Sequence, residues 1–124
     1  MALILAADDD EVLVAMLQAH LESAGHRVVI ANDGPSVTRK ARESLPDLMI
    51  LDLKMPGLSG AATFRALDEE ITRKVPVIFI SGLPEEKARR QTLLPLWSRG
   101  RFLVKPLDFN QLDAMIDELL KSNE

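Results

Sequence analysis

Cysteine is absent from this chain of 124 residues, and so are long apolar runs. Without cysteine there is no disulfide framework and no metal site built from thiolates. Every apolar run is well short of the roughly 20 residues that a membrane-spanning helix needs. The N-terminal stretch MALILAADDD carries acids beside its apolar run, whereas a secretory signal peptide carries basic residues. We therefore expect a cytoplasmic protein with no membrane contact.

Basic charge and a glycine-rich loop are also missing where two common functions need them. The formal net charge is -4, which disfavours direct binding to nucleic acid because phosphate contacts need basic patches. The segment ADDDEV, which follows the first apolar run, contains no glycine-rich phosphate loop. A transferase or dehydrogenase that depends on such a loop is therefore disfavoured.

The chain does have a large apolar content, with 47% hydrophobic residues. This content is enough to bury one core without disulfides, and 124 residues is a common size for one domain. Neither repeats nor linker-like stretches interrupt the sequence. We predict a single domain over 1–124.

Short apolar runs of strand length alternate with longer amphipathic stretches. The runs cover 2–7, 27–31, 48–53, 75–80 and 101–104. This alternation is typical of a parallel sheet with helices on both faces. Charged residues flank the second and fifth runs, so we place these at the edges, and right-handed crossovers then favour the strand order 2-1-3-4-5. The predicted fold is α/β, a three-layer (βα)5 sandwich of the flavodoxin-like type.

The amphipathic stretches carry helix signals. Pro35 suits the first turn of a helix, Ser59 suits an N-cap, and Asp108 with Gln111 resembles a capping box. Gly25 is a typical stop for the first helix. Apolar residues of that helix recur every three or four positions, at Leu13, Met16, Leu17, Leu21 and Ala24.

Polar residues follow the strands at the edge where open α/β sheets bind ligands, outside the strands' carboxyl ends. Crowded carboxylates repel one another unless a cation intervenes. Carboxylate-rich oxygen sites suit Mg²⁺ or Mn²⁺ rather than zinc. The residues at these ends are Asp8, Asp9, Asp10, Asp52, Ser81 and Lys105.

This set of groups is suited to a phosphoryl group. Mg²⁺ binds through one or two carboxylates together with a phosphate oxygen. Asp52 is the candidate nucleophile, since carboxylates form acyl phosphates. Mg²⁺ and Lys105 would neutralise the transferring group, and the Ser81 hydroxyl would hydrogen-bond one of its oxygens.

Each feature also has an ordinary structural explanation. Acids before a helix complement the helix dipole. A serine at a strand end, a Lys-Pro pair and the Met55-Pro56-Gly57 stretch are each common in turns and loops. Only their coincidence at successive strand ends favours phosphoryl chemistry.

With these residues in place, the sequence resembles the receiver domain of two-component response regulators over essentially the whole chain. The matching motifs are ILAADDDEVL, PDLMILDLKMPGLSG, VIFISG and FLVKP. The resemblance implies that Asp9 is a direct metal ligand and that Asp8 acts on the metal largely through water. It implies that Asp52 is the phosphoacceptor and that Lys54 offers its backbone carbonyl to the metal.

The resemblance also implies a switch and its partners. Ser81 would be the switch hydroxyl, Phe102 the switch aromatic and Lys105 the lysine of the site, with a cis bond to Pro106. A sensor histidine kinase or a histidine phosphotransfer protein would donate the phosphoryl group. Phosphorylation would draw Ser81 and then Phe102 inward and change the face formed by helix 85–94, strand 101–104 and the last helix. That face would control a downstream protein, as a monomer or as a phosphorylation-dependent dimer. Such a protein is no enzyme beyond assisting its own phosphorylation and dephosphorylation.

Some positions depart from the usual family pattern. Gly82 replaces a more usual alanine, and Phe102 lacks the hydroxyl of a more usual tyrosine. Lys54 and Leu83 occupy positions that tune phosphoryl lifetime in this family, so we hypothesise that they change it here; Lys54 could equally be a solvated surface charge. The stretch 84–100 is longer than usual, and it contains Trp97, which either contacts a partner or packs beneath a turn.

Two other classes compete with a working phospho-receiver. A phosphorylation-independent interaction module on the same fold would be marked by loss of an acid, the acceptor or the lysine, and all of these are present. A haloacid-dehalogenase-type phosphatase would need a second aspartate two residues after the nucleophile, where this chain has Lys54. The cognate kinase, stimulus and output are not encoded in recognisable motifs.

Overall fold

The computed structural model describes residues 2–54, 74–84, 87 and 100–122. The first half contains strand β1 (Leu3–Ala7), helix α1 (Glu11–Ser23), strand β2 (Arg27–Ala31), helix α2 (Gly34–Ser44) and strand β3 (Leu48–Asp52). The second half contains strand β4 (Val77–Ser81), strand β5 (Arg101–Val104) and helix α6 (Phe109–Ser122). These strands agree with the predicted apolar runs to within two residues at each end.

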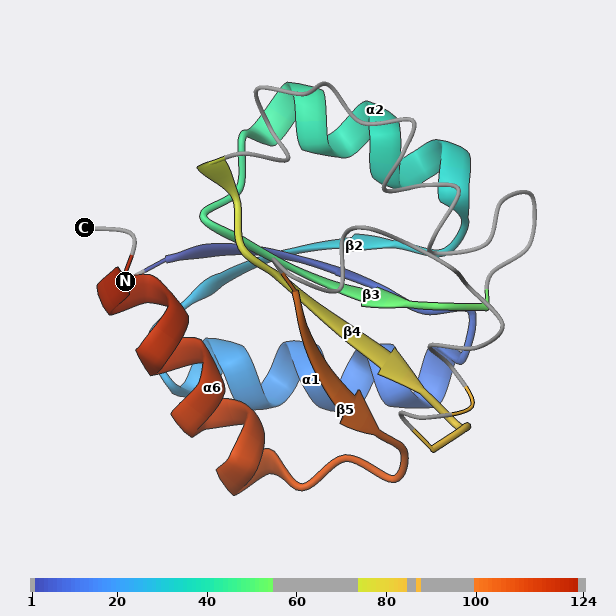
Figure 1. Cartoon of the computed structure of the whole chain (residues 1–124). Helices are drawn as coiled ribbons and strands as arrows, with labels where there is room; N and C mark the ends of the chain where they lie inside the picture. Colours follow the sequence, from blue (N-terminus) through green and yellow to red (C-terminus); the bar gives the residue numbers. More distant parts are fainter. Residues whose placement is uncertain (1, 55–73, 85–86, 88–99, 123–124) are drawn as a thin grey trace.

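The strands form one parallel sheet in the order β2-β1-β3-β4-β5. The predicted order is therefore confirmed, and so is the placement of β2 and β5 at the edges. Figure 1 shows α2 on one face of the sheet and α1 with α6 on the other, which gives three layers. In the described part of the chain, no helix is long and apolar enough to span a membrane.

Side chains of successive strand residues alternate between the two faces of the sheet. In β1, Leu5 and Ala7 join the core beneath α2, whereas Ile4 and Ala6 join the core beneath α1 and α6. The central strands β3 and β4 are buried along their whole length. Two apolar layers thus hold the sheet rigidly and fix where each strand ends.

Local chemistry sets the helix ends. Asp10 accepts hydrogen bonds from the first turn of α1, and Asp33 does the same for α2, with Pro35 in its first turn. Gly25 follows α1 with a φ of 94°, a conformation that glycine adopts at little cost. Asp108 accepts bonds from the backbone N–H groups of Asn110 and Gln111, so the predicted cap of α6 is confirmed.

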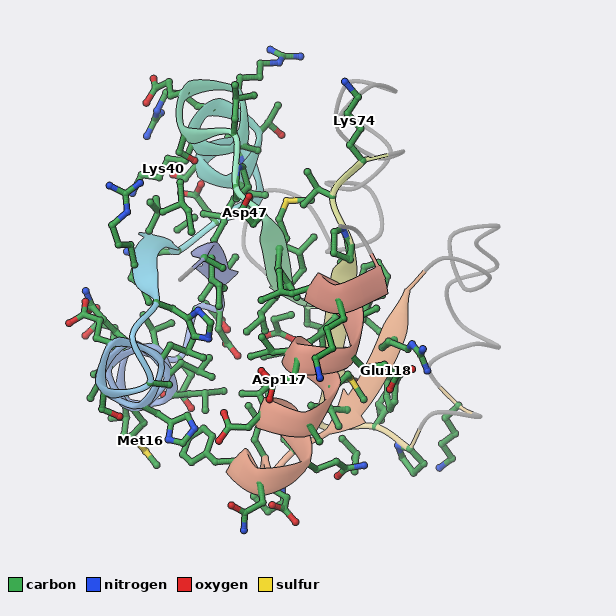
Figure 2. All side chains as sticks on the ribbon, turned by 90° about the vertical axis from the view of Figure 1, so that its left-hand side faces the viewer. Met16, Lys40, Asp47, Lys74, Asp117 and Glu118 are labelled. Atoms are coloured by element: carbon green, nitrogen blue, oxygen red, sulfur yellow. The ribbon has the colours of Figure 1, made fainter. Side chains whose placement is uncertain are left out.

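Two residues of the apolar stripe predicted for the first helix are exposed. Met16 is 49% exposed on the outer side of α1 (Figure 2), because Leu17 and Leu21 already fill the space against the sheet. Ala24 is exposed as well, just after the helix. The helix expected after Ser59, the helix expected at 85–94, the Met-Pro-Gly turn and Trp97 lie outside the described residues.

Candidate functional site

The register of the sheet brings the predicted polar residues to one edge. Ala7 pairs with Leu51, so Asp8 and Asp52 follow neighbouring positions on β1 and β3. Ser81 pairs with Val104, which places Lys105 just beyond β5. Apolar pairing inside the sheet thus positions the charged groups at its carboxyl edge.

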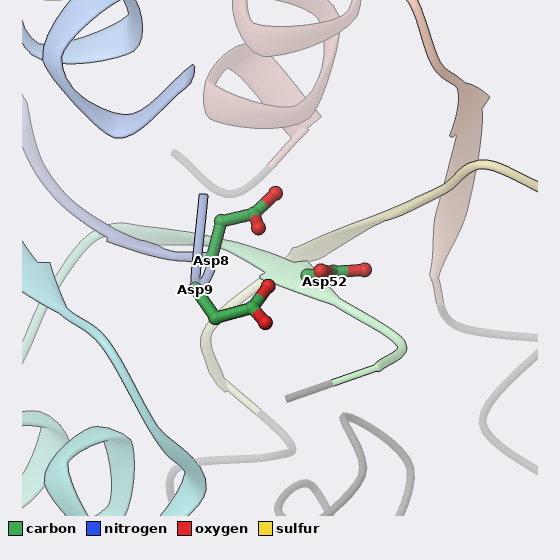
Figure 3. A group of neighbouring side chains, drawn as sticks. All are labelled: Asp8, Asp9 and Asp52. Atoms are coloured by element: carbon green, nitrogen blue, oxygen red, sulfur yellow. The ribbon is translucent and has the colours of Figure 1, made fainter. Parts of the chain in front are cut away.

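Three carboxylates gather at this edge (Figure 3). One oxygen each of Asp8, Asp9 and Asp52 lies within 4.8 Å of the others. Asp8 is fully buried and Asp52 is 4% exposed, whereas Asp9 is exposed. Two buried carboxylates with a third at the surface form a pocket that opens to solvent on one side.

Lys105 supplies the positive charge of this pocket. Its Nζ lies 2.8 Å from Asp8 Oδ2 and donates a hydrogen bond of 3.3 Å to Asp52 Oδ2. The contact with Asp8 is an ion pair to a buried carboxylate oxygen, which accepts no hydrogen bond from any other described residue. A single ammonium group therefore contacts two carboxylates.

Backbone N–H groups hold the other oxygens of the same two carboxylates. Asp8 Oδ1 accepts a bond of 2.9 Å from the N–H of Asp10. Asp52 Oδ1 accepts a bond of 3.2 Å from the N–H of Lys54. Each carboxylate is therefore fixed by a loop donor on one oxygen and faces the ammonium with the other.

The environment moves the pKa values of these groups in different directions. Burial, followed by the nearby charge of Asp8, raises the pKa of Asp52 to about 6. Burial also acts to raise the pKa of Asp8, but Lys105 and the Asp10 N–H outweigh it and hold that pKa below its usual value. Burial acts to lower the pKa of Lys105, and the contacts with Asp8 and Asp52 hold it above normal. When the two carboxylates share one proton, Asp52 carries it.

The two candidate switch residues lie close to this pocket along the sheet. Ser81 is buried at the end of β4, and its Oγ accepts a bond of 3.0 Å from the N–H of Leu83. Phe102 is half-buried on β5, opposite Phe79, and packs against the core on the α2 side. The peptide bond between Lys105 and Pro106 is cis, as the resemblance implies.

The donor set fits a hard divalent cation. It consists of carboxylate oxygens, which Mg²⁺ and Mn²⁺ prefer, and includes no nitrogen or sulfur ligand among the described residues. Buried Asp8 Oδ2 lies 2.8 Å from the Lys105 ammonium, so a cation is already the partner of this oxygen. The cluster of Asp8, Asp9 and Asp52 is thus arranged like a Mg²⁺ site.

Two features of this edge were not predicted. Asp10 is the N-cap of α1, so its own backbone N–H is held where it reaches Asp8. An acid directly before a helix was the signal in the sequence that could have indicated this role.

The second feature is a cavity of about 420 Å³ beside the acidic pocket. Lys105, which contacts Asp8 and Asp52, and Asp10, whose N–H bonds Asp8, both line it. Apolar residues line the rest of it, namely Val12, Leu13, Met16, Pro106, Leu107 and Phe109.

Comparison with known proteins decides the family. The model of the response regulator receiver domain matches residues 4–117. The chain belongs to this family. A receiver domain is a signalling module of two-component systems rather than a catalytic enzyme, and the acidic pocket of this receiver is typical of a phospho-accepting aspartate site.

Individual relatives agree with this assignment. The response regulator PleD of Caulobacter vibrioides is 37% identical over 97% of this receiver, which spans 26% of PleD. Protein PilH of Pseudomonas aeruginosa is 32% identical over 97% of the chain and 98% of its own length. The chain therefore corresponds to about a quarter of one relative and nearly all of another.

A solved relative contains the ligands that the pocket suggests. The response regulator TrrA of Thermotoga maritima, solved in complex with Mg(2+)-BeF, has a TM-score of 0.82 and 25% identity, covering 96% of this chain and 99% of its own. The receiver domain of Francisella response regulator 1452 has a TM-score of 0.86 at 24% identity and supports the fold.

Proposed function

We propose that Asp52 accepts a phosphoryl group and that Asp52, together with Asp8 and Asp9, holds a Mg²⁺ ion at the same site. The observation that carries this proposal is a buried carboxylate at a strand end, inside an acidic cluster and hydrogen-bonded to Lys105. A buried carboxylate with that partner and that neighbourhood has little use in stabilising the fold. The described elements form one sheet, which supports treating 1–124 as a single receiver domain.

The reaction transfers phosphorus from nitrogen to oxygen. A phosphohistidine of the donor protein loses its bond between nitrogen and phosphorus, and the electron pair stays on the imidazole nitrogen. A carboxylate oxygen of Asp52 forms the new bond to phosphorus. Since the pKa of Asp52 is about 6, the carboxyl is mainly ionised at pH 7 and ready to attack. Mg²⁺, when bound, would neutralise charge on the transferred group.

The remaining site residues receive supporting roles in this proposal. Lys105 would neutralise the phosphoryl oxygens, since its ammonium already contacts Asp52. Lys54 would offer its backbone carbonyl to the metal, as its N–H already fixes Asp52. Ser81 would leave the N–H of Leu83 to bond the phosphoryl group, and Phe102 would follow it inward.

A receiver domain implies a histidine kinase partner, and the finer identity of the donor is part of the proposal. We propose a sensor histidine kinase or a histidine phosphotransfer protein, which would dock on the exposed apolar side chains of Val12 and Met16 beside the pocket. Docking there would bring the donor histidine to the open side of the carboxylates. A downstream protein would recognise the face that includes β5 and α6.

Intact mass after incubation with Mg²⁺ and acetyl phosphate tests the acceptor. We expect wild type to gain one phosphoryl group and Asp52→Ala to gain none. Wild type that remains unmodified with the small donor and with a partner kinase would contradict the proposal and favour an interaction module that works without phosphorylation.

A second variant tests the docking surface separately. Met16→Glu places a charge on the exposed apolar surface without touching a carboxylate of the site. We expect it to slow phosphorylation by the kinase at least about tenfold and to leave phosphorylation by acetyl phosphate unchanged. Equal slowing with both donors, or with neither, would reject this docking surface.

A further inference from the structure

We propose that Lys105 is an internal counter-cation that competes with Mg²⁺ for the acidic pocket, so that its charge lowers the affinity of the site for the metal. This inference rests on the proposed function, because it concerns regulation of the same pocket. Its consequence runs against the usual effect of removing a site residue: loss of Lys105 strengthens metal binding.

The first observation is that the ammonium already occupies a cation position. Nζ of Lys105 lies 2.8 Å from Asp8 Oδ2 and 3.3 Å from Asp52 Oδ2. These residues are two of the three carboxylates that would surround a metal. A divalent cation bound by these carboxylates would lie close to the Lys105 ammonium, and two positive charges so close together repel each other strongly.

The second observation is that the ammonium meets Asp8 at a buried oxygen. Asp8 Oδ2 lies 2.8 Å from Nζ of Lys105 and has no hydrogen bond from any other described residue. A metal held at this oxygen, directly or through water, would therefore have to displace the ammonium. Asp9, the third carboxylate, is exposed and lies beside Asp8 (Figure 3).

The competition gives the ammonium two successive positions. Without metal, Lys105 contacts both Asp8 and Asp52 and keeps the buried carboxylates from repelling one another. A divalent cation bound by the cluster would displace the ammonium from Asp8 Oδ2, and the contact with Asp52 Oδ2 would be the one that Lys105 keeps. Metal binding thereby directs the lysine to the acceptor residue before a phosphoryl group arrives.

Calorimetric titration with MgCl₂ at pH 8, where the carboxyl groups are ionised, tests this idea. Lys105→Met keeps the length of the side chain and removes its charge. We expect its Kd for Mg²⁺ to be about tenfold lower than that of wild type. Lys121→Met is the matched control, since it removes one exposed positive charge from the last turn of α6, and its Kd should stay within about twofold of wild type. An unchanged or weaker affinity in Lys105→Met overturns the proposal.

A measurement on wild type keeps the proposal testable if Lys105→Met fails to fold. With ¹³C-labelled lysine, NMR resolves the ε-methylene groups next to each ammonium. Saturation with Mg²⁺ should shift the Lys105 signal and leave the Lys121 signal in place. A Lys105 signal that does not respond to saturating Mg²⁺ overturns the proposal.

The two proposals fail in different ways. A wild-type protein that binds Mg²⁺ but never gains a phosphoryl group contradicts only the proposed function. A wild-type protein that is phosphorylated on Asp52, while Lys105→Met binds Mg²⁺ no tighter, contradicts only the competition.

Discussion

Polar groups are arranged in opposite ways at the two ends of the parallel strands, which are called the amino edge, where the strands begin, and the carboxyl edge, where they end. At the amino edge, polar groups pair locally with the backbone: Asp47 accepts a bond of 2.8 Å from the N–H of Leu3, and the Leu3 carbonyl accepts one of 2.8 Å from the N–H of Asp47. His26 accepts a bond of 3.3 Å from the N–H of Ala2. Figure 2 views the molecule from this edge, with Asp47 between the helices of the two layers.

The carboxyl edge instead brings charged side chains toward one another. Asp8 and Asp52 are buried side by side and share one ammonium. Burial, followed by the charge of Asp8, raises the pKa of Asp52 to about 6 although Lys105 acts to lower it. Pairing at the amino edge stabilises the fold, whereas crowding at the carboxyl edge costs stability. Burial and the charge of Asp8 disfavour the ionised form of Asp52, so we expect a cation at this end of the strands to relieve the repulsion between the two carboxylates.

The largest effect should come from removing the charge of Asp52. Its pKa is raised from 3.8 to about 6, so the folded state favours the protonated form. The contribution of this preference to the free energy of unfolding is fully present below pH 3.8 and is lost as the pH rises through about 6. For the metal-free protein we expect Asp52→Asn to raise the free energy of unfolding at pH 8 by about 1 to 3 kcal/mol.

Urea unfolding with EDTA at pH 8 and at pH 4.5 would measure this gain. The gain should be smaller at pH 4.5, where the wild-type carboxyl is already protonated in the folded state. Equal or lower stability of the variant at pH 8 would show that the carboxyl edge is not electrostatically strained.

A steric change at the amino edge should have the opposite sign. A Cβ at Gly100, just before β5, would lie 2.6 Å and 2.9 Å from two ring carbons of Phe79, which is fully buried. We expect Gly100→Ala to lower the free energy of unfolding by about 1 to 3 kcal/mol. Calorimetric Mg²⁺ affinity should stay unchanged, because this residue is far from the acidic pocket along the strand.

The matched control lies at the carboxyl edge. Apart from its chain neighbours, no atom of the described residues lies within 4 Å of the position of a new Cβ at Gly82. Gly82→Ala should therefore change stability by less than about 0.5 kcal/mol. If both alanine variants lose the same stability, the close contact with Phe79 is not the cause.

The smallest effect concerns the aspartate of the amino edge. Asp47→Ala removes the acceptor of an exposed hydrogen bond to the Leu3 N–H. We expect a loss of about 0.5 to 1.5 kcal/mol in the free energy of unfolding. Thermal unfolding of Asp47→Ala and Asp52→Asn at pH 8 would show whether the two substitutions change stability in opposite directions. We expect Asp47→Ala to be less stable than wild type and Asp52→Asn to be more stable. A gain for both would remove the contrast between the edges.

Much of the fold could be predicted because apolar periodicity and strand length are local properties. The strand order followed from which runs carry flanking charge. The place of Pro35 in the first turn of α2 and the cap at Asp108 followed from residue type, whereas the N-cap of α2, Asp33, was not predicted. The gathering of Asp8, Asp9 and Asp52 could be predicted for the same reason: parallel strands end at one edge.

Contacts between distant residues could not be predicted. Nε2 of His20 on α1 lies 2.8 Å from Oδ1 of Asp113 on α6, and the His20 ring stacks on the ring of Phe109. In the sequence, 93 positions separate His20 from Asp113. Nothing in the local sequence pairs them. The exposure of Met16 depends likewise on how the two helices pack, and periodicity alone places it with the buried residues.

The detailed geometry of the acidic pocket could not be predicted from the sequence either. The residue types indicate that Lys105 neutralises the acidic cluster, but they do not indicate that it contacts Asp8 more closely than Asp52. That preference depends on the path of the chain after β5. The proposed competition with Mg²⁺ depends on it and could only come from the structure.

The most direct test of the central claim is ¹⁹F NMR with beryllium fluoride, which forms an adduct on carboxylates that mimics a phosphoryl group. With Mg²⁺ present, we predict a bound fluorine signal in wild type and none in Asp52→Asn. The signal should disappear when EDTA removes the metal. A wild type that shows no bound signal, or a signal that persists in Asp52→Asn, would contradict the claim that Asp52 is the metal-assisted phosphoacceptor of this receiver domain.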